Sequence, residues 1–211
     1  MAENFDYLTL SSDYKAMAPY WSMVGTLLEG ASAVREEKTF LPQFPNEGNT
    51  NYDYRRKNAK FTNIYRDVVE NLAAKPFTKE VRLADDSVSE PIEAVVEDVD
   101  GSGNHLHAFA TNYFFSAVSD AITWLLVDYP SMPEGATLAD ERAAGVRPFW
   151  VQIQATDMLA CYSAPIAGKE AFVYARIREI TTELDGDDEI TVTRAMRQTD
   201  QTFVTIPKNN L

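Results

Sequence analysis

Cysteine and histidine are scarce in this 211-residue chain, which contains one cysteine and two histidines. The single cysteine, Cys161, allows no disulfide bond within the chain and favours a reducing compartment. His105 and His107, without a Cys or a third His nearby, supply too few ligands for a zinc site, and no Gly-x-Ser-x-Gly elbow that would present a nucleophilic serine occurs. These shortages argue against zinc chemistry and against triad-type hydrolysis.

Long apolar runs and positive charge are also lacking. No run reaches the ~18 residues that a transmembrane helix needs, and the first residues are acidic where a secretory signal is basic. We therefore expect a soluble, intracellular protein without membrane partners. The net charge is −13, from 19 Lys and Arg against 32 Asp and Glu. Such a surface excludes broad attraction to nucleic-acid phosphates, so a phosphate-binding patch must be local.

The remaining composition is that of an ordinary globular protein, with 45% apolar and 24% charged residues. Its acidic residues are unevenly spread. Between Glu80 and Glu141 the chain has thirteen Asp or Glu and one base, Arg82. We call this segment the acidic block; it predicts a solvated surface or a repulsive wall.

Helical periodicity dominates the first two thirds of the chain. It predicts three helices, over residues 13–28, 52–74 and 104–122. A Ser11-Ser12-Asp13 signal opens the first, which we expect Pro19 to interrupt, and Pro76 ends the second. Between the second and third helices, residues 79–97 predict a short strand and a mobile acidic loop.

Strands are predicted for the last third. The apolar run 124–130 indicates a buried strand, and residues 131–147 a loop with one helical turn at 138–144. Further strands are expected over residues 149–154, 171–181, 189–197 and 202–206, with a hairpin turn at Asp185-Gly186-Asp187. The fold class is therefore α+β: a flexible N-terminus (1–12), a mainly helical region (13–148) and an antiparallel, strand-rich region (149–211).

The segment Asp98-Val-Asp100-Gly-Ser102-Gly-Asn104 begins like a calcium-binding loop, with side-chain oxygens at positions one, three and five. The twelfth position, which needs a bidentate Glu, is Phe109. We therefore interpret the segment as a Gly-rich turn whose Ser or Asn caps the following helix. A helix over 104–122 would point His105 and His107 about 200° apart, too far to share a metal. The sequence predicts no metal and no cofactor.

One basic cluster, of Arg55, Arg56, Lys57 and Lys60, occurs on the polar side of the second predicted helix. It is either a solvated helix face or a contact site for phosphates or for the acidic block of a neighbouring copy. The last alternative would favour head-to-tail association into a ring.

Short motifs occur in a characteristic order along residues 14–180. They are Tyr20-Trp21, residues 30–35, Phe40-Leu41-Pro42 with Pro45 and Glu47, residues 52–61, the 98–103 turn, residues 126–130, Arg147-Pro148-Phe149 and Arg176-Ile177-Arg178-Glu179. In this order and spacing they resemble the portal proteins of tailed phages, in particular a phage family known as a domain of unknown function with a portal-like fold. A glycine that the family usually has before the strand at 126–130 is absent here.

The resemblance implies a structural subunit of a dodecameric ring at one capsid vertex, located in the virion and made in the host cytoplasm. It implies contacts with capsid protein, packaging ATPase and head-tail adaptor, passage of double-stranded DNA without sequence specificity, and no catalytic residues. Family members are much longer, so the chain would be the truncated, N-terminal, wing-like part. The alternatives are another virion connector or capsid-associated module, or a small hydrolase or calcium-binding protein using the Asp98–Asp100 turn.

Overall fold

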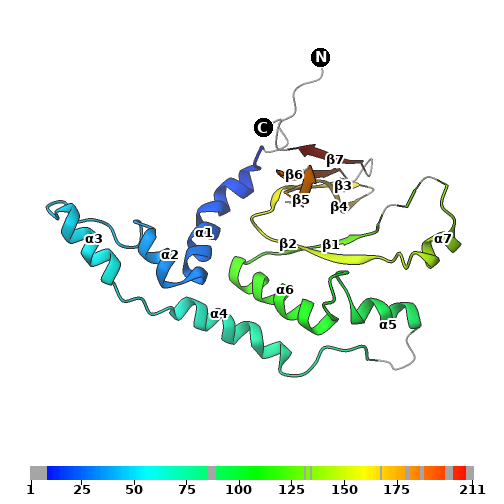
Figure 1. Cartoon of the computed structure of the whole chain (residues 1–211), viewed down its shortest axis with the longest axis horizontal. Coiled ribbons are helices and arrows are strands. Elements are labelled where there is room, and N and C mark those ends of the chain that lie inside the picture. Colours follow the sequence, from blue (N-terminus) through cyan, green and yellow to red (C-terminus); the bar gives the residue numbers. More distant parts are fainter. Residues whose placement is uncertain are drawn as a thin grey trace, which may run out of the picture. The chain divides into compact units, whose positions relative to one another are not determined.

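The computed structural model describes residues 9–84, 89–130, 132–133, 135–166, 168–178, 181–185, 188–197 and 202–207. Most helices precede the strands along the chain, so the fold class is α+β as predicted (Figure 1). The chain forms two compact units. One, here the sheet unit, combines Met1–Trp21 with Ile153–Leu211, and the other, the helical unit, is Ser22–Gln152. Of the N-terminus predicted to be flexible, residues 1–8 lie outside the described residues.

Helix α1 (Ser12–Glu29) begins at the predicted cap, where the Ser11 hydroxyl accepts a hydrogen bond from the Tyr14 N–H at 3.1 Å. The predicted interruption at Pro19 is wrong, because α1 continues through it. A proline removes one backbone hydrogen bond and bends a helix without having to end it. In the sheet unit, the Ser11 N–H donates to the Leu159 carbonyl at 3.0 Å, which ties the start of α1 to the sheet.

The single helix predicted over 52–74 is also wrong. After the short α2 (Ala31–Glu36), the chain forms two helices, α3 (Asn49–Asn58) and α4 (Ile64–Ala74). Asn63 separates them, because its side-chain oxygen accepts the Arg66 N–H at 3.0 Å and caps α4. An N-cap residue has a non-helical backbone, so a cap inside an apolar periodic stretch starts a new helix.

A second correction concerns residues 79–97. After the 3-10 turn η1 (Lys75–Phe77), the chain forms helix α5 (Glu90–Glu97) where a strand and loop were predicted. Pro91 favours this start, since proline suits the first turn of a helix. The Ser89 carbonyl accepts the N–H of Ile92 at 2.8 Å. Residues 85–88 of the predicted loop lie outside the described residues.

Helix α6 (Leu106–Asp120) confirms the third predicted helix and ends at Ala121, whose backbone is left-handed with φ 63°. Strand β1 (Trp124–Asp128), the turn α7 (Leu138–Ala143) and strand β2 (Phe149–Ile153) follow where the sequence predicted them. Strands β1 and β2 pair. The prediction that β1 is buried is wrong, because its side chains alternate between half-buried and exposed.

The core of the helical unit forms around α6. Phe109 packs edge-on against Trp150 of β2, with ring centroids 5.9 Å apart, and Phe114 packs against Phe77 of η1 at 5.7 Å. Helix α4 lies along α6, and the Tyr65 hydroxyl donates to the Ser119 carbonyl at 2.8 Å. Helix α6 is therefore held between the β1–β2 pair and the α4–η1 segment.

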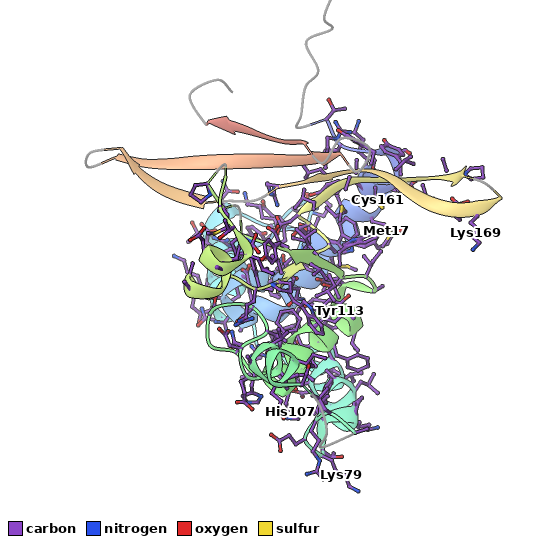
Figure 2. All side chains as sticks on the ribbon, turned by 90° about the vertical axis from the view of Figure 1, so that its right-hand side faces the viewer. Met17, Lys79, His107, Tyr113, Cys161 and Lys169 are labelled. Atoms are coloured by element: carbon purple, nitrogen blue, oxygen red, sulfur yellow. The ribbon has the colours of Figure 1, made fainter. Side chains whose placement is uncertain are left out.

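The sheet unit has five antiparallel strands: β3 (Met158–Ile166), β4 (Lys169–Ile177), β5 (Thr181–Asp185), β6 (Asp188–Arg197) and β7 (Thr202–Pro207). The order is β3-β4-β6-β5, and β7 pairs with β6. The stretch around Cys161 has a loop-like sequence, but it forms strand β3, and Cys161 lies opposite Ala175 of β4. Figure 2 marks Cys161 and Lys169 on this β3–β4 hairpin.

Two further predicted features of the sheet unit are only partly described. The strand predicted over 171–181 comprises most of β4 and the first residue of β5, and residues 179–180 lie outside the described residues. Asp185 pairs with Asp188 across β5 and β6, as expected for a two-residue hairpin turn. Gly186 and Asp187, predicted to form that turn, are themselves outside the described residues.

We predict that Phe109→Ala lowers the free energy of unfolding by about 3–5 kcal/mol, the usual cost of truncating a buried Phe. Phe109 is 9% exposed. Phe114→Ala should cost less because Phe114 is only half-buried, and Asn112→Ala on the exposed side of α6 serves as control. Urea denaturation measures all three. Equal losses for Phe109→Ala and Asn112→Ala would contradict this packing of α6.

Candidate functional site

Arg55, in the predicted basic cluster, is held within the chain rather than offered to a partner. Its guanidinium forms a two-pronged ion pair with Glu47, at 2.8 and 2.6 Å, and also donates to the Pro42 carbonyl at 2.9 Å. The same guanidinium lies over the rings of Phe44 and Tyr52, at 4.7 and 5.4 Å from their centroids. Arg55 therefore fixes the loop before α3.

The charge state of Glu47 follows from this contact. The hydrogen bond from Arg55 is the largest influence and holds the pKa of Glu47 below its usual value, while the same bond raises the pKa of Arg55. Tyr52 adds a hydrogen bond from its hydroxyl to the Leu41 carbonyl at 3.0 Å. Several weak contacts thus hold one loop in place. Together they stabilise it more than an isolated surface ion pair would.

The other three residues of the basic cluster do not share one face with Arg55. Arg56 donates to the Arg35 carbonyl at 3.1 Å and lies 3.8 Å from Asp53. Lys57 at the end of α3 and Lys60 in the linker are exposed. The cluster is therefore divided: its arginines hold segments of the helical unit together, and its lysines are accessible.

Sequence reasoning missed an exposed apolar row on α4, made of Ile64, Val68 and Leu72. Their spacing places all three in the apolar stripe of the helix predicted over 52–74, and such a stripe is expected to face the core. Val69 and Ala73 are buried instead, since they face α6. Helical spacing alone finds the apolar residues of a helix, but it does not show which of two adjacent rows a neighbour covers.

The two carboxylates of the 98–104 turn, Asp98 and Asp100, are held by hydrogen bonds and an ion pair. Asp100 accepts hydrogen bonds from the N–H of Ser102 at 2.9 Å and from the side-chain amide of Asn104 at 2.7 Å. Asp98 accepts the Gly103 N–H at 2.8 Å and pairs with Arg147 at 2.7 Å. The predicted turn is confirmed in part. The predicted helix cap by Ser or Asn is wrong, because the N-cap residue of α6 is His105, without a side-chain cap bond.

Hydrogen bonds within the turn stabilise the charged form of Asp100. Burial is the largest single influence and raises the pKa of Asp100, but the hydrogen bonds from Asn104 and Ser102 together outweigh it. The pKa of Asp100 consequently lies below its ordinary value. Its stabilising contribution is present above the pKa of the unfolded chain, near 3.9, and is lost as the pH falls through the folded value.

The two histidines are closer than predicted. His105 has an extended backbone (φ −74°, ψ 161°), so helical geometry does not separate it from His107. Their rings stack, with centroids 6.1 Å apart, and His107 Nδ1 accepts the Val81 N–H at 3.1 Å. Among the described residues, no group of three or more His, Cys, Asp or Glu side chains is arranged to hold a metal.

A cavity of about 350 Å³ lies between the 98–104 turn, α6 and β2. Phe109 and Trp150 form its apolar wall, and Asp100 and Asn104, hydrogen-bonded to each other, contribute to its polar side. No lysine or arginine is among its lining residues, so the cavity does not favour phosphate-bearing ligands.

None of the helices in the described part of the chain combines the length and apolar character that crossing a bilayer requires.

We predict that calcium neither binds the 98–104 turn tightly nor raises the melting temperature, because both carboxylates are already occupied. Titration calorimetry and melting curves with calcium or a chelator test this. Dissociation constants in the micromolar range, abolished by Asp100→Ala, would contradict the prediction. Asp13→Ala, far along the sequence, controls for unspecific loss of charge.

Arg55→Ala should lower the melting temperature at neutral pH, since it removes the partner of Glu47 and the contact with the Pro42 carbonyl. The difference from the unsubstituted protein should shrink as the pH falls through the lowered pKa of Glu47, because protonated Glu47 no longer forms the ion pair. Lys57→Ala, on the same helix, should leave the melting temperature unchanged. A pH-independent difference would contradict the ion-pair explanation.

The comparisons with protein families and curated proteins identified no relative of this chain. No protein-family model matches the sequence, and no curated protein matches it. The likeness to portal proteins therefore rests on the order of the short motifs along residues 14–180.

Proposed function

We propose that the chain is a structural subunit of a tailed-phage portal ring, through which DNA is packaged and ejected. The proposal starts from the motifs that resemble the portal family. Its main support is that residues of these motifs bind one another. Arg55 pairs with Glu47, and Arg147 pairs with Asp98.

Some of these contacts join neighbouring motifs, eight to eleven residues apart, and the Asp98–Arg147 contact joins motifs 49 residues apart. Tyr52 donates to the Leu41 carbonyl, and the N–H of Trp150, directly after Arg147-Pro148-Phe149, donates to the Val99 carbonyl at 2.7 Å. Residues that are used in this way stabilise a scaffold. That is the pattern expected of a structural subunit whose partners bind at its surfaces.

The charge of the chain suits a DNA channel that does not retain DNA. A net charge of −13 repels phosphates, and the acidic block concentrates that charge in one segment. In the proposed ring, capsid protein, packaging ATPase and head-tail adaptor are the protein partners, and double-stranded DNA passes without sequence-specific contacts. On the same proposal the protein is located at a capsid vertex and has no enzymatic activity.

We predict that the natural gene product containing this sequence assembles into dodecameric rings with a central channel, visible by electron microscopy. The 211-residue chain alone should be monomeric or weakly associated, because stable interfaces usually bury about 1,600 Å² and the family ring also uses further parts. Native mass spectrometry compares the two. A folded gene product that never forms rings would contradict the portal proposal, and a discrete complex with capsid protein would then favour another virion connector.

A further inference from the structure

Helix α4 leaves one apolar side uncovered. Ile64, Val68 and Leu72 follow one another at four-residue steps and are 67%, 49% and 47% exposed. The adjacent row of the helix, with Val69 and Ala73, is buried. Three large aliphatic side chains in a row on an exposed helix face are typical of a surface that another protein covers. We call these three residues the α4 row.

Lysines surround the α4 row. Lys75 follows Leu72 by three residues, Lys60 precedes Ile64, and Lys79 comes after η1; all three are exposed. Figure 2 shows Lys79 projecting from the ribbon. Within the described part of the chain, these lysines have no carboxylate partner. The surface around α4 is therefore apolar at its centre, and lysines outnumber the exposed Asp67 of α4 at its margin.

Helix α5 of the same unit carries the opposite charge. Ile92 is 49% exposed, and Glu93 and Glu97, one helical turn apart, are exposed beside it. Glu93 and Glu97 belong to the acidic block. In Figure 1, α4 and α5 lie apart within the helical unit. Every copy of the chain therefore presents two different surfaces that match in charge and in apolar character.

We propose that α4 of one copy packs against α5 of a second copy. Ile92 would cover part of the α4 row, while Glu93 and Glu97 would approach the lysines at its margin. A nucleic acid could bind the lysines, but its phosphates would leave the α4 row exposed to water. A second copy satisfies the apolar and the charged parts together, so it is the occupant that the surface favours.

This contact is heterologous, because it joins two different surfaces of the chain. Repeated around an axis, such a contact closes into a ring or continues as a filament. The inference thus rests on the proposed function and specifies one contact between neighbouring subunits of the ring. A contact between two short helices is much smaller than a stable interface of about 1,600 Å². We therefore expect it to be weak in the isolated chain and sensitive to salt.

A cross-linking experiment tests the geometry directly. Two single variants, Leu72→Cys and Ile92→Cys, are made in a Cys161→Ser background and mixed under oxidising conditions. Disulfide-linked dimers should form in the mixture and not in either variant alone. A mixture of Leu72→Cys with Leu138→Cys, whose α7 side chain is also exposed, is the matched control. Equal cross-linking in both mixtures, or none in the first, would overturn the proposal.

Charge exchange tests the electrostatic part. Reversing Lys75 and Lys79 to Glu should weaken self-association roughly tenfold in sedimentation velocity at low salt. Mixing this variant with one that carries Glu93→Lys and Glu97→Lys should restore association, while Lys38→Glu, exposed in the same unit, should have no effect. Circular dichroism verifies that each variant is folded. Failure of the mixture to restore association would count against the α4–α5 pairing.

The two proposals can fail separately. Rings of the gene product without the Leu72–Ile92 cross-link would leave the portal function standing and remove this contact. A cross-link without rings would leave the contact standing and remove the portal function. If Leu72→Cys resisted labelling by a maleimide in the monomer, the α4 row would already be covered there, and the proposed docking of a second copy would be wrong.

Discussion

The helical unit depends on one buried backbone position, Val99, between α5 and α6. Its N–H donates to the Asn104 carbonyl at 2.9 Å, its carbonyl accepts the Trp150 N–H at 2.7 Å, and its side chain is 1% exposed. A buried peptide group without partners costs about as much as a lost hydrogen bond. The turn, the start of α6 and strand β2 are therefore coupled through this residue. The ion pair between Asp98 and Arg147 adds a second link beside it.

Much of the fold follows from local patterns, but two segments depart from them for different reasons. Helix α6 has a sustained period, and the predicted strands that were found are rich in β-branched and aromatic residues. The helix predicted over 52–74 divides because the single side chain of Asn63 caps a new helix inside a continuous apolar pattern. Strand β3 contains Ala, Ser and Pro and has a weak strand signal of its own. Its pairing with β4 determines its conformation, and such nonlocal pairing is not visible in a short segment of sequence.

The sequence predicted which residues belong to the candidate site, but not which residues they contact. The sequence identified the cluster that begins at Arg55, but the partner of Arg55 is Glu47, across a loop whose path the sequence does not define. The α4 row shows the same limit. Apolar spacing located Ile64 and Leu72, and only the packing of α4 on α6 decides that their side of the helix stays uncovered.

Arginine and lysine have different roles in this acidic chain. Arg55, Arg147 and Arg178 each pair with a carboxylate at least eight residues away in sequence and so join separate segments. A guanidinium suits this role because its planar set of donors fixes the geometry of a carboxylate, whereas an ammonium is a mobile point charge. The exposed lysines around α4 are therefore the charges on that surface best suited to reversible contacts. Salt should screen those contacts well before it affects the half-buried arginine pairs, so association and folding respond to different ionic strengths.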